Sequence, residues 1–289
     1  MRMIALRNEH LSITVNPHGA ELGSIVSHDG RAWLWNGDAR YWAGRAPILF
    51  PVVGASAGGQ VKIAGHTFQM EQHGFARRSD FSLISSTEQT CLLRLSQNEA
   101  TLARFPFRFE LDIAFALEGA TLAVIGSVKN RTETEMPFGF GFHPAFAWPL
   151  PDCEGLPHLC WLDAEEEPRT RRLTPEGLLI PDAEPSIFKK GMLTLEHRLF
   201  ERRAIILDDL RSRTVSYGVP RRTFIDLEFE GLTQLGIWTK PDAPFLCLEP
   251  WQGMAAEQGA TIDLEHRPGT VTLSPGGTRS FVMRATFSL

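Results

Sequence analysis

His143 is the only ionisable residue in the stretch MPFGFGFHPAFAWPL, which runs from Met136 to Leu150. Successive side chains of a strand point to opposite faces. One face here is a row of large apolar side chains: Met136, Phe138, Phe140 and Phe142. Glycines inside a strand often mark a close approach by a ligand or another backbone, so the pattern predicts a groove with Gly139 and Gly141 as floor and His143 at its end. A core histidine hydrogen-bonded to a carbonyl is the alternative.

Glu249 ends an apolar run in the segment TKPDAPFLCLEPWQG, on the same strand face as Phe245 and Cys247. A carboxylate in such surroundings costs free energy unless it is paired or used. Partial burial raises its pKa toward neutrality, which suits a general base, although an ion pair with an arginine explains it equally well. Trp251 either stacks on a sugar face or, more commonly, fills core volume.

Two further segments carry candidate polar groups. His73 precedes Gly74 in MEQHGFARRSDF, which predicts a loop or a strand end, with a simple surface turn as the alternative. Arg45 leads into the apolar run from Pro47 to Val52. An arginine at that place is either a rim charge or a donor to sugar hydroxyls or phosphate at the mouth of a sheet.

Several familiar catalytic motifs are missing. The sequence contains no GxGxxG, GxxxxGK[ST], GxSxG or HExxH. Its nine histidines show no ligand-type spacing, so we predict no metal and no cofactor. Two histidines and a carboxylate, without a nucleophile motif, suit proton transfer between oxygen atoms.

The elements that must position these residues are strands. Apolar and polar residues alternate through 11–15, 107–117 and 281–287, which is typical of strands half-buried in an antiparallel sheet. LSPGGTRS, 273–280, predicts a hairpin turn. Helices are expected at most as short pieces within 163–180 and 250–258, and 151–190 is expected to be a long surface excursion. We therefore predict one all-β domain of two packed sheets spanning 1–289.

Composition sets outer limits on function. The chain has 289 residues, a net charge of −5 and 43% hydrophobic residues, enough for a substantial core. The mild acidity argues against nucleic acid and anionic membranes as partners. The start lacks the pattern of a signal peptide, no apolar run is long enough to span a bilayer, and the four cysteines are scattered. We expect a cytoplasmic monomer or homodimer whose partner is a small molecule.

The ordered set RAPILFPVVG, QHGFARRSDF, GFGFHPAF and PFLCLEPWQG resembles the aldose 1-epimerase (mutarotase) family. The resemblance covers essentially the whole chain, and it is nearest to the branch that also contains glucose-6-phosphate 1-epimerase-like proteins. NPHGAEL near the start and LSPGGTRSF near the end fit the same family. It implies a large antiparallel β-sandwich, the supersandwich of galactose mutarotase-like proteins, with a sugar on its concave face.

The resemblance also implies roles for individual residues. The family interconverts the α and β anomers of an aldose by opening the ring. Carried over, Glu249 takes the proton of the C1 hydroxyl, His143 protonates the ring oxygen and His73 polarises the same region. We expect the base to be ionised and the acid protonated, because their surroundings push the two pKa values apart.

Substrate contacts follow from the same resemblance. Arg45 holds hydroxyls, and Trp251 is a candidate to stack on the sugar. The family has a further aspartate on the sugar hydroxyls, for which AIILDDL offers Asp208 and Asp209, and Asp209 is the expected one. Arg45 and Arg77 match positions that clamp a phosphate in phosphosugar members, so the substrate is a free aldose or a hexose 6-phosphate, with the free sugar favoured.

Two rival functions belong to other classes. A non-catalytic carbohydrate-binding protein can use the same groove, because fold does not fix function. Such a binder has no reason to hold a carboxylate and an imidazole on opposite sides of a ring. A glycan lyase or hydrolase would need a second acid or a tyrosine, and the only tyrosines, Tyr41 and Tyr217, lie outside the motifs.

Overall fold

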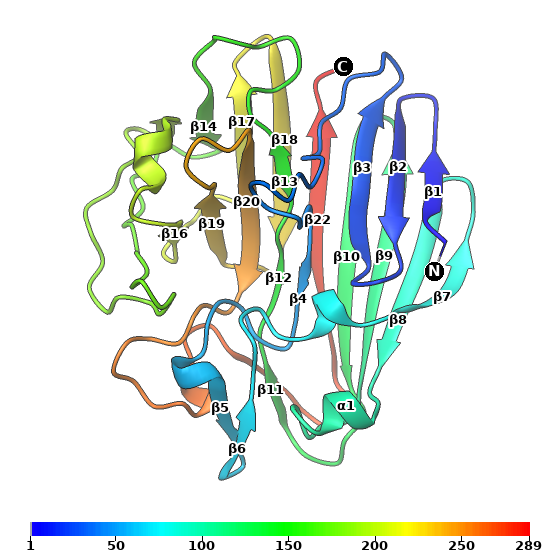
Figure 1. Ribbon diagram of the computed structural model, residues 1–289, viewed down its shortest axis with the longest axis vertical. Helices are drawn as coiled ribbons and strands as arrows, with labels where there is room; N and C mark the ends of the chain where they lie inside the picture. Colours follow the sequence, from blue (N-terminus) through cyan, green and yellow to red (C-terminus); the bar gives the residue numbers. More distant parts are fainter. Residues whose placement is uncertain (1) are drawn as a thin grey trace.

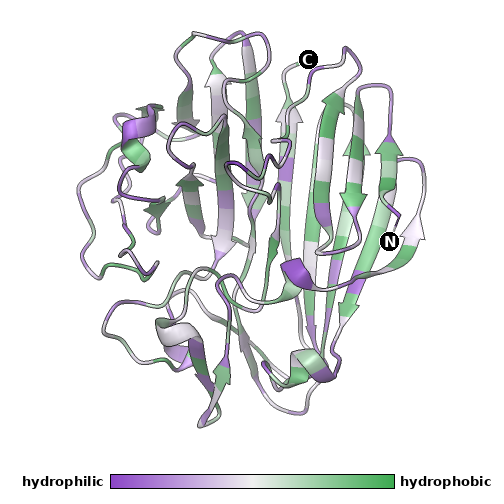
Figure 2. Ribbon diagram, viewed as in Figure 1, coloured by the Kyte–Doolittle hydropathy of each residue, from purple (hydrophilic) through white to green (hydrophobic). Residues whose placement is uncertain are grey.

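Nine antiparallel strands form the largest sheet of the computed structural model, which describes residues 2–289 (Figure 1). In spatial order they are β15 (Met192–Thr194), β14 (Leu159–Leu162), β17 (Thr214–Val219), β18 (Thr223–Glu230), β22 (Thr278–Phe287), β10 (Thr121–Asn130), β9 (Phe109–Glu118), β8 (Thr90–Ser96) and β7 (Ser82–Ser86). Along β9, buried and half-buried residues alternate almost without exception. Figure 2 shows the same alternation as green and purple bands on the long strands. One face of this sheet is therefore the floor of the core.

A second, six-stranded sheet carries the residues that the sequence analysis selected. Its strands are β16 (Ile205–Leu207), β19 (Gln234–Trp238), β20 (Phe245–Gln252), β12 (Phe140–Phe142) and β4 (Ile48–Leu49), with β13 (Ala145–Ala147) also paired to β20. Every residue of β20 is buried. A strand buried on both faces must be covered on each side, and this explains why its sequence is apolar almost throughout.

Three smaller sheets and short helices complete the fold. The sheets are β1 (Ile4–Arg7), β2 (Leu11–Asn16) and β3 (Glu21–Ser27); β11 (Met136–Phe138) with β21 (Val271–Leu273); and β5 (Gln60–Ile63) with β6 (His66–Gln69). The helical pieces are α1 (Glu99–Leu102) and the 3₁₀ turns Ala57–Gly59, Ala76–Arg78, His197–Phe200 and Leu264–His266. No helix among residues 2–289 is long and apolar enough to cross a membrane.

The main core lies between the nine-stranded sheet and the sheets that cover it. Phe109 of β9, Ile13 of β2, Phe142 of β12 and Leu248 of β20 belong to one continuous cluster of buried side chains. Since Leu248 points into this core, its neighbour Glu249 must point to the opposite face of the six-stranded sheet. The prediction of an all-β antiparallel sandwich is thus confirmed, and the polar candidates lie on the face turned away from the main core.

The expected hairpin at 273–280 is wrong. A turn is present, because the Gly277 N–H donates to the Ser274 carbonyl at 2.9 Å. However, β21 before the turn pairs with β11, whereas β22 after it pairs with β10 and β18. The chain passes from one sheet to another at this turn, which local sequence cannot distinguish from a hairpin.

The expected short helices within 163–180 and 250–258 are also wrong. Residues 163–180 are irregular apart from isolated bridges, and residues 250–252 continue strand β20. The predicted excursion at 151–190 is present on the left of Figure 1, but it contributes β14 to the large sheet. Backbone groups of 163–180 pair with other segments instead, as where the Arg171 N–H donates to the Ile206 carbonyl at 2.8 Å, and such bonds take the place of those within a helix.

Candidate active site

A cavity of about 280 Å³ opens on the face of the six-stranded sheet that is turned away from the main core. The residues around it come from distant parts of the chain: the loops after β4 and β6, strands β19 and β20, and the excursion at 173–177. Three of the predicted site residues, Glu249, His143 and His73, lie together in its wall. Their meeting is a property of the tertiary structure, since Glu249 comes 176 positions after His73 in the sequence.

Glu249 and His143 form a buried polar pair in the wall of the cavity. The His143 Nε2 atom lies 3.1 Å from the Glu249 Oε2 atom, and the two residues are only 6% and 2% exposed. Glu249 is fixed by strand pairing, because it lies opposite Gly236 of β19. His143 lies between β12 and β13, where the next residue, Pro144, accepts a hydrogen bond from the Leu248 N–H at 3.2 Å. Both side chains are therefore held by the same strand, β20.

Burial shifts the pKa values of this pair in opposite directions. Burial raises the pKa of Glu249 well above its usual value. Burial, together with the charge of Arg77, lowers the pKa of His143 to about 3. Without substrate, both shifts favour the neutral forms, so the expected arrangement of an ionised base and a protonated acid is wrong for the empty cavity. A neutral pair and a carboxylate–imidazolium pair nevertheless contain the same single proton, and moving it between the two atoms interconverts them.

His73 is held in an unusual backbone conformation. It has a φ of +64°, and the following Gly74 has a φ of +70°. A Cβ atom on Gly74 would lie 2.2 Å from the Phe50 carbonyl oxygen, so only glycine fits there. The Gly54 N–H donates to His73 Nδ1 at 3.1 Å, and the His73 N–H donates to the Gly54 carbonyl at 3.0 Å.

The bond from Gly54 decides which nitrogen of His73 carries hydrogen. An Nδ1 atom that accepts a hydrogen bond from a backbone N–H is unprotonated, so the neutral ring carries its hydrogen on Nε2. Burial, together with the charges of His143, Arg77 and Arg267, lowers the pKa of His73 well below its usual value, which keeps the ring neutral. Its ring centroid lies 5.5 Å from that of His143. The side-chain amide of Gln72 lies 3.2 Å from His73 Nε2, and with hydrogen on Nε2 this amide presents its oxygen to the ring. His73 is therefore a neutral hydrogen-bond donor beside the Glu249–His143 pair, with Gln72 as its partner in the empty cavity.

Three tryptophans give the cavity its apolar surfaces. Trp42, Trp238 and Trp251 all line it, and the Trp42 ring centroid lies 5.1 Å from that of His143. Only Trp251 was predicted from the sequence. Broad aromatic faces suit the C–H face of a sugar ring, and an indole N–H can bind a hydroxyl. The Trp251 Nε1 and His143 Nδ1 atoms are buried and have no hydrogen-bond partner within residues 2–289.

The position of Trp251 shows that the predicted groove, with Gly139 and Gly141 as its floor, is wrong. A Cβ atom on Gly141 would lie 2.5 Å from the Trp251 ring, and one on Gly236 would lie 2.6 Å from it. The indole therefore covers the space above these two glycines. Gly139 meets backbone instead, since its Cβ position is 3.3 Å from the Gln252 carbonyl oxygen. The glycines permit close packing of a neighbouring side chain and backbone, and the floor of the cavity is the Trp251 ring.

Two arginines reach the cavity, and one of them was missed. Arg77 and Arg203 both line it. Arg77 donates from Nη2 to the Gln72 carbonyl at 2.9 Å, while its buried Nε has no hydrogen-bond partner in the described chain. Arg203 lies in a loop, where its own φ is +66°. Its guanidinium donates to the Pro175 carbonyl. Nothing in the sequence around Arg203 distinguishes it from the neighbouring surface arginines.

Arg45 lies outside the cavity, contrary to its predicted contact with hydroxyls. Its guanidinium donates to the Gly23 carbonyl, and its backbone N–H donates to Glu21 Oε1 at 2.7 Å. Its own carbonyl accepts from the Ala145 N–H at 2.8 Å. Arg45 thus joins β3 to β13 behind the site, and we do not propose a substrate contact for it.

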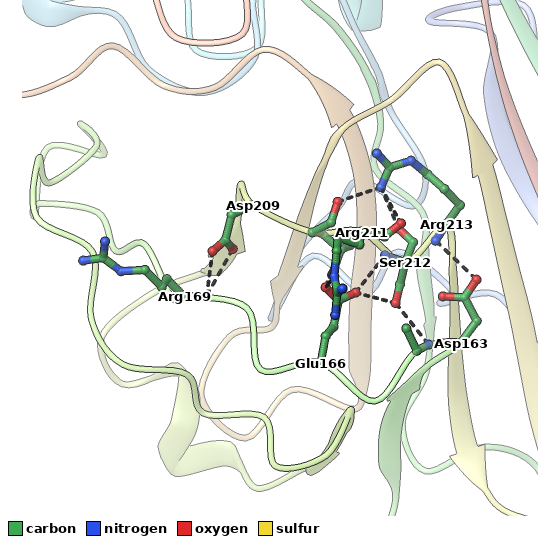
Figure 3. Close-up of polar contacts among 9 residues, drawn as sticks. Asp163, Glu166, Arg169, Asp209, Arg211, Ser212 and Arg213 are labelled. Atoms are coloured by element: carbon green, nitrogen blue, oxygen red, sulfur yellow. Dashed lines mark hydrogen bonds and ion pairs between the residues drawn. The ribbon is translucent and has the colours of Figure 1, made fainter.

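Asp209, the expected partner of sugar hydroxyls, is likewise directed elsewhere. It is exposed and accepts the Arg169 backbone N–H at 3.1 Å, as Figure 3 shows. Asp208 forms an ion pair with Arg171 at 2.7 Å. Neither aspartate lines the cavity. The two carboxylates anchor the excursion to the segment after β16, and no direct role on a substrate follows.

Further contacts attach the excursion that forms one wall of the cavity. Figure 3 shows buried Glu166 accepting hydrogen bonds from the Ser212 N–H at 2.7 Å and the Ser212 hydroxyl at 2.5 Å. Arg171 pairs with Asp208 and, at 3.3 Å, with Glu257. Arg171 is two residues from Leu173, which lines the cavity. Its ion pairs therefore tie this wall to the segment after β16 and to Glu257.

His143, Cys247 and Glu249 are the one group of possible metal donors found among the described residues, with donor atoms within 4.8 Å of one another. Sequence spacing did not reveal this set, because it combines two residues of β20 with a residue that follows β12 more than a hundred positions earlier. Burial and the nearby charge of Glu249 raise the pKa of the Cys247 thiol well above its usual value. A metal ligand must be a thiolate, and Cys247 does not line the cavity. The set therefore fits a resident metal poorly, and no step is derived through one.

Solved structures show which fold this is. A galactose mutarotase-like protein from Lactobacillus casei ATCC 334 matches with a TM-score of 0.93 and 29% identity, covering 99% of this chain and 100% of that one. A galactose mutarotase related enzyme from Lactobacillus acidophilus matches with a TM-score of 0.91 and 28% identity, covering 100% and 98%. The fold is accordingly a galactose mutarotase-like β-sandwich.

Sequence comparison gives the family. The family model described as Aldose 1-epimerase matches residues 2–286. Protein LacX, chromosomal, of Lactococcus lactis subsp. lactis is 31% identical over 283 residues, which is 94% of this chain and 95% of LacX. The chain belongs to the aldose 1-epimerase family. The resemblance of its motifs to the aldose 1-epimerase family is thus confirmed.

Proposed function

We propose that this protein interconverts the α and β anomers of a hexose by acid–base catalysed ring opening. The observation that carries the proposal is the pair formed by Glu249 and His143, 3.1 Å apart in the wall of a cavity that also contains His73. Membership of the aldose 1-epimerase family supports it. A carboxylate and an imidazole that share one proton are the minimum needed to remove a proton from one oxygen and deliver one to another.

The reaction needs no external acid or base. In the reactive tautomer Glu249 is ionised and His143 is protonated. Glu249 removes the proton of the C1 hydroxyl while His143 gives its proton to the ring oxygen, and the bond between C1 and the ring oxygen breaks. The open-chain aldehyde rotates about the C1–C2 bond. Closure on the other face of C1 returns a proton to His143 and takes one from Glu249, so the pair ends with the single proton with which it began.

The remaining groups of the cavity orient the sugar. The Nε2–H of His73 would donate to an oxygen near the reacting centre in place of the Gln72 side chain, because its Nδ1 is occupied by the Gly54 N–H. Trp42, Trp238 and Trp251 offer apolar surfaces to the ring carbons. The unpartnered indole N–H of Trp251 is a candidate donor to a hydroxyl. Substrate binding would thereby satisfy polar atoms that the empty cavity leaves unpaired.

The first test is the rate at which a freshly dissolved anomer equilibrates. With α-glucose or α-galactose in two-dimensional exchange NMR, we expect catalytic amounts of protein to raise the exchange rate between anomers above the spontaneous rate. A protein that binds either sugar in calorimetry but leaves exchange at the spontaneous rate would be a carbohydrate-binding protein, and the proposal would be wrong.

A hexose 6-phosphate is the second candidate substrate. Arg77 and Arg203 bring two guanidinium groups to a cavity whose only carboxylate is Glu249, within the chain described. Arg77 also has a free buried Nε. Guanidinium groups bind phosphate oxygens with strong, charge-assisted hydrogen bonds.

Arg77→Ala separates the two substrate classes. If the phosphate is held by Arg77, the substitution should raise the KM for α-hexose 6-phosphates by ~10–100-fold, as expected for loss of a charge-assisted contact, and change that for free hexoses far less. Arg78→Ala is the matched control, because Arg78 is adjacent, pairs with Glu71 and does not line the cavity. If Arg77→Ala changed the KM of both sugar classes equally, Arg77 would not bind a phosphate, and the free aldose would remain as the proposed substrate.

A further inference from the structure

Arg267 is a buried cation with no carboxylate beside it. It is 8% exposed, and no acidic group within residues 2–289 lies within 4.0 Å of it. All of its contacts are with neutral acceptors. Its Nε donates to the Met254 carbonyl at 2.7 Å, and Nη1 donates to the Ser56 hydroxyl at 2.7 Å. Its Nη2 donates to the Ala55 carbonyl at 2.9 Å and to the Val53 carbonyl.

Leaving such a charge without a counterion costs free energy, even when every N–H finds an acceptor. Burial lowers the pKa of Arg267 to about 9. An apolar residue of similar size would avoid this cost if the side chain only had to fill space. The position of the guanidinium therefore indicates a more specific role, and its four acceptors show which part of the structure that role concerns.

These acceptors belong to two chain segments that meet at the cavity. Val53, Ala55 and Ser56 follow β4, and Met254 follows β20. The two segments touch where Gly54 packs against Ala255, since a Cβ on Gly54 would lie 2.7 Å from Ala255. Gly54 and Ala255 both line the cavity. Arg267 lies behind them and does not line it, so it can reach a substrate only through this loop.

Gly54 is also the residue that fixes His73. Its N–H donates to His73 Nδ1 at 3.1 Å, and its carbonyl accepts from the His73 N–H at 3.0 Å. The carbonyls immediately before and after Gly54, those of Val53 and Ala55, are both bound by Arg267 Nη2. The Val53 carbonyl belongs to the same planar peptide unit as the Gly54 N–H, so the guanidinium that binds this carbonyl also sets the direction of the Gly54 N–H.

We propose that Arg267 is a positioning residue that fixes the tautomer of His73 by orienting the Gly54 N–H, and that it is needed for that reason in the reaction proposed above. The inference rests on the proposed function only for its effect on rate. The effect on the His73 ring exists in the protein without substrate and can be measured there. Groups that orient metal-bound imidazoles contribute ~10–100-fold to activity, and we expect an effect of that order here.

Two variants weaken the hydrogen bonds of Arg267 to its four acceptors, here called the Arg267 clamp, to different degrees. Arg267→Lys keeps the charge but cannot donate to all four acceptors. Ser56→Ala removes only the acceptor of Nη1 and is the milder change. Arg172→Lys is the matched control, because Arg172 is 6% exposed and lies outside the cavity, with its Nη1 donating to the Leu199 carbonyl at 3.3 Å. It reports what an arginine-to-lysine change in a buried site does to stability alone.

The primary readout is the protonation of the imidazole nitrogens of His73 in ¹⁵N-histidine-labelled protein, assigned with a His73→Gln spectrum. Wild type should show an unprotonated Nδ1 and a protonated Nε2. Arg267→Lys should shift both signals toward a mixture of tautomers, with a smaller shift in Ser56→Ala and none in Arg172→Lys. In the anomer exchange assay, kcat should fall ~10–100-fold in Arg267→Lys with a much smaller change in KM.

The outcomes separate this inference from the proposed function. If the tautomer shifts as expected but wild type does not accelerate anomer exchange, the clamp stands and the proposed function fails. If wild type is active and folded Arg267→Lys keeps both the His73 signals and kcat, Arg267 only stabilises the loop and the inference is wrong. Should Arg267→Lys not fold, an unchanged His73 ring in Ser56→Ala would overturn the inference in the same way.

Discussion

Glu249→Gln is expected to lower the rate of anomer exchange by ~10²–10⁴-fold, the usual contribution of one positioned acid or base. Glutamine has nearly the same size as glutamate but cannot accept the proton of the C1 hydroxyl. Since Glu249 is paired across to Gly236 within a fully buried strand, the substitution should leave the backbone unchanged. We expect the loss in kcat, measured by exchange NMR, with sugar affinity in calorimetry changed by less than about tenfold.

The same substitution should change the pH dependence of stability in a defined direction. The folded-state pKa of Glu249 is raised above 4.5, its usual value. The stability linked to this group is therefore complete below pH 4.5 and is lost as the pH rises through the raised folded-state pKa. Glutamine does not titrate, so Glu249→Gln should gain stability relative to wild type at alkaline pH in urea unfolding.

Glu166→Gln is the matched control, because Glu166 is a buried carboxyl away from the cavity. Burial raises the pKa of Glu166, but hydrogen bonds from Ser212 and Arg211 outweigh it and lower the pKa below 4.5. Its stabilising effect is present above pH 4.5 and is lost as the pH falls. Glu166→Gln should therefore be less stable than wild type at neutral and alkaline pH, with kcat retained. An active Glu249→Gln enzyme would rule out Glu249 as the base.

His143→Asn is expected to produce the second large loss, again ~10²–10⁴-fold in kcat, because the ring oxygen then leaves without a proton donor. Combining it with Glu249→Gln should lose far less than the product of the two single effects, since the residues act on one proton as a unit. If the double variant instead lost as much kcat as the product of the two single losses, Glu249 and His143 would act independently.

The pH profile distinguishes the roles within the pair. In wild type, activity should be bell-shaped. Its acid limb lies near pH 3, the lowered pKa of His143, and its alkaline limb lies above 4.5, at the raised pKa of Glu249. In His143→Asn only the ionised carboxylate matters, so the residual activity should rise with pH. His158→Asn, at a buried histidine outside the cavity whose Nε2 accepts from the Leu150 N–H at 2.9 Å, should keep the wild-type profile.

Alternation in the sequence predicted the strands well because each long strand has one face in the core. Phe109 to Leu117 alternate as expected, and so do the apolar residues of β22. The pairing of strands did not follow from local sequence. The turn at 274–277 joins strands of two different sheets, and the register that places Trp251 over Gly141 and Gly236 depends on three strands at once.

The polar centre of the site was predictable from the free-energy cost of burying it. A carboxylate in β20 and an imidazole among phenylalanines are unusual enough to indicate a role, and the structure brings both into one cavity. Trp42 and Arg203 carry no such signal, because they come from loops whose position is set by tertiary contacts. Arg45 and Asp209 illustrate the reverse error. Each is a plausible ligand by type, but each side chain is bound to a backbone group away from the cavity.

The geometry of a bound sugar tests the account most directly. A crystal structure of Glu249→Gln soaked with α-galactose or α-glucose should show the C1 hydroxyl within ~2.6–3.2 Å of the side chain at position 249, and the ring oxygen at a similar distance from a ring nitrogen of His143. The sugar should rest on the Trp251 ring, with His73 Nε2 facing the same reacting centre. A sugar bound in this cavity with its C1 hydroxyl directed away from position 249, or bound only elsewhere on the protein, would contradict the mechanism.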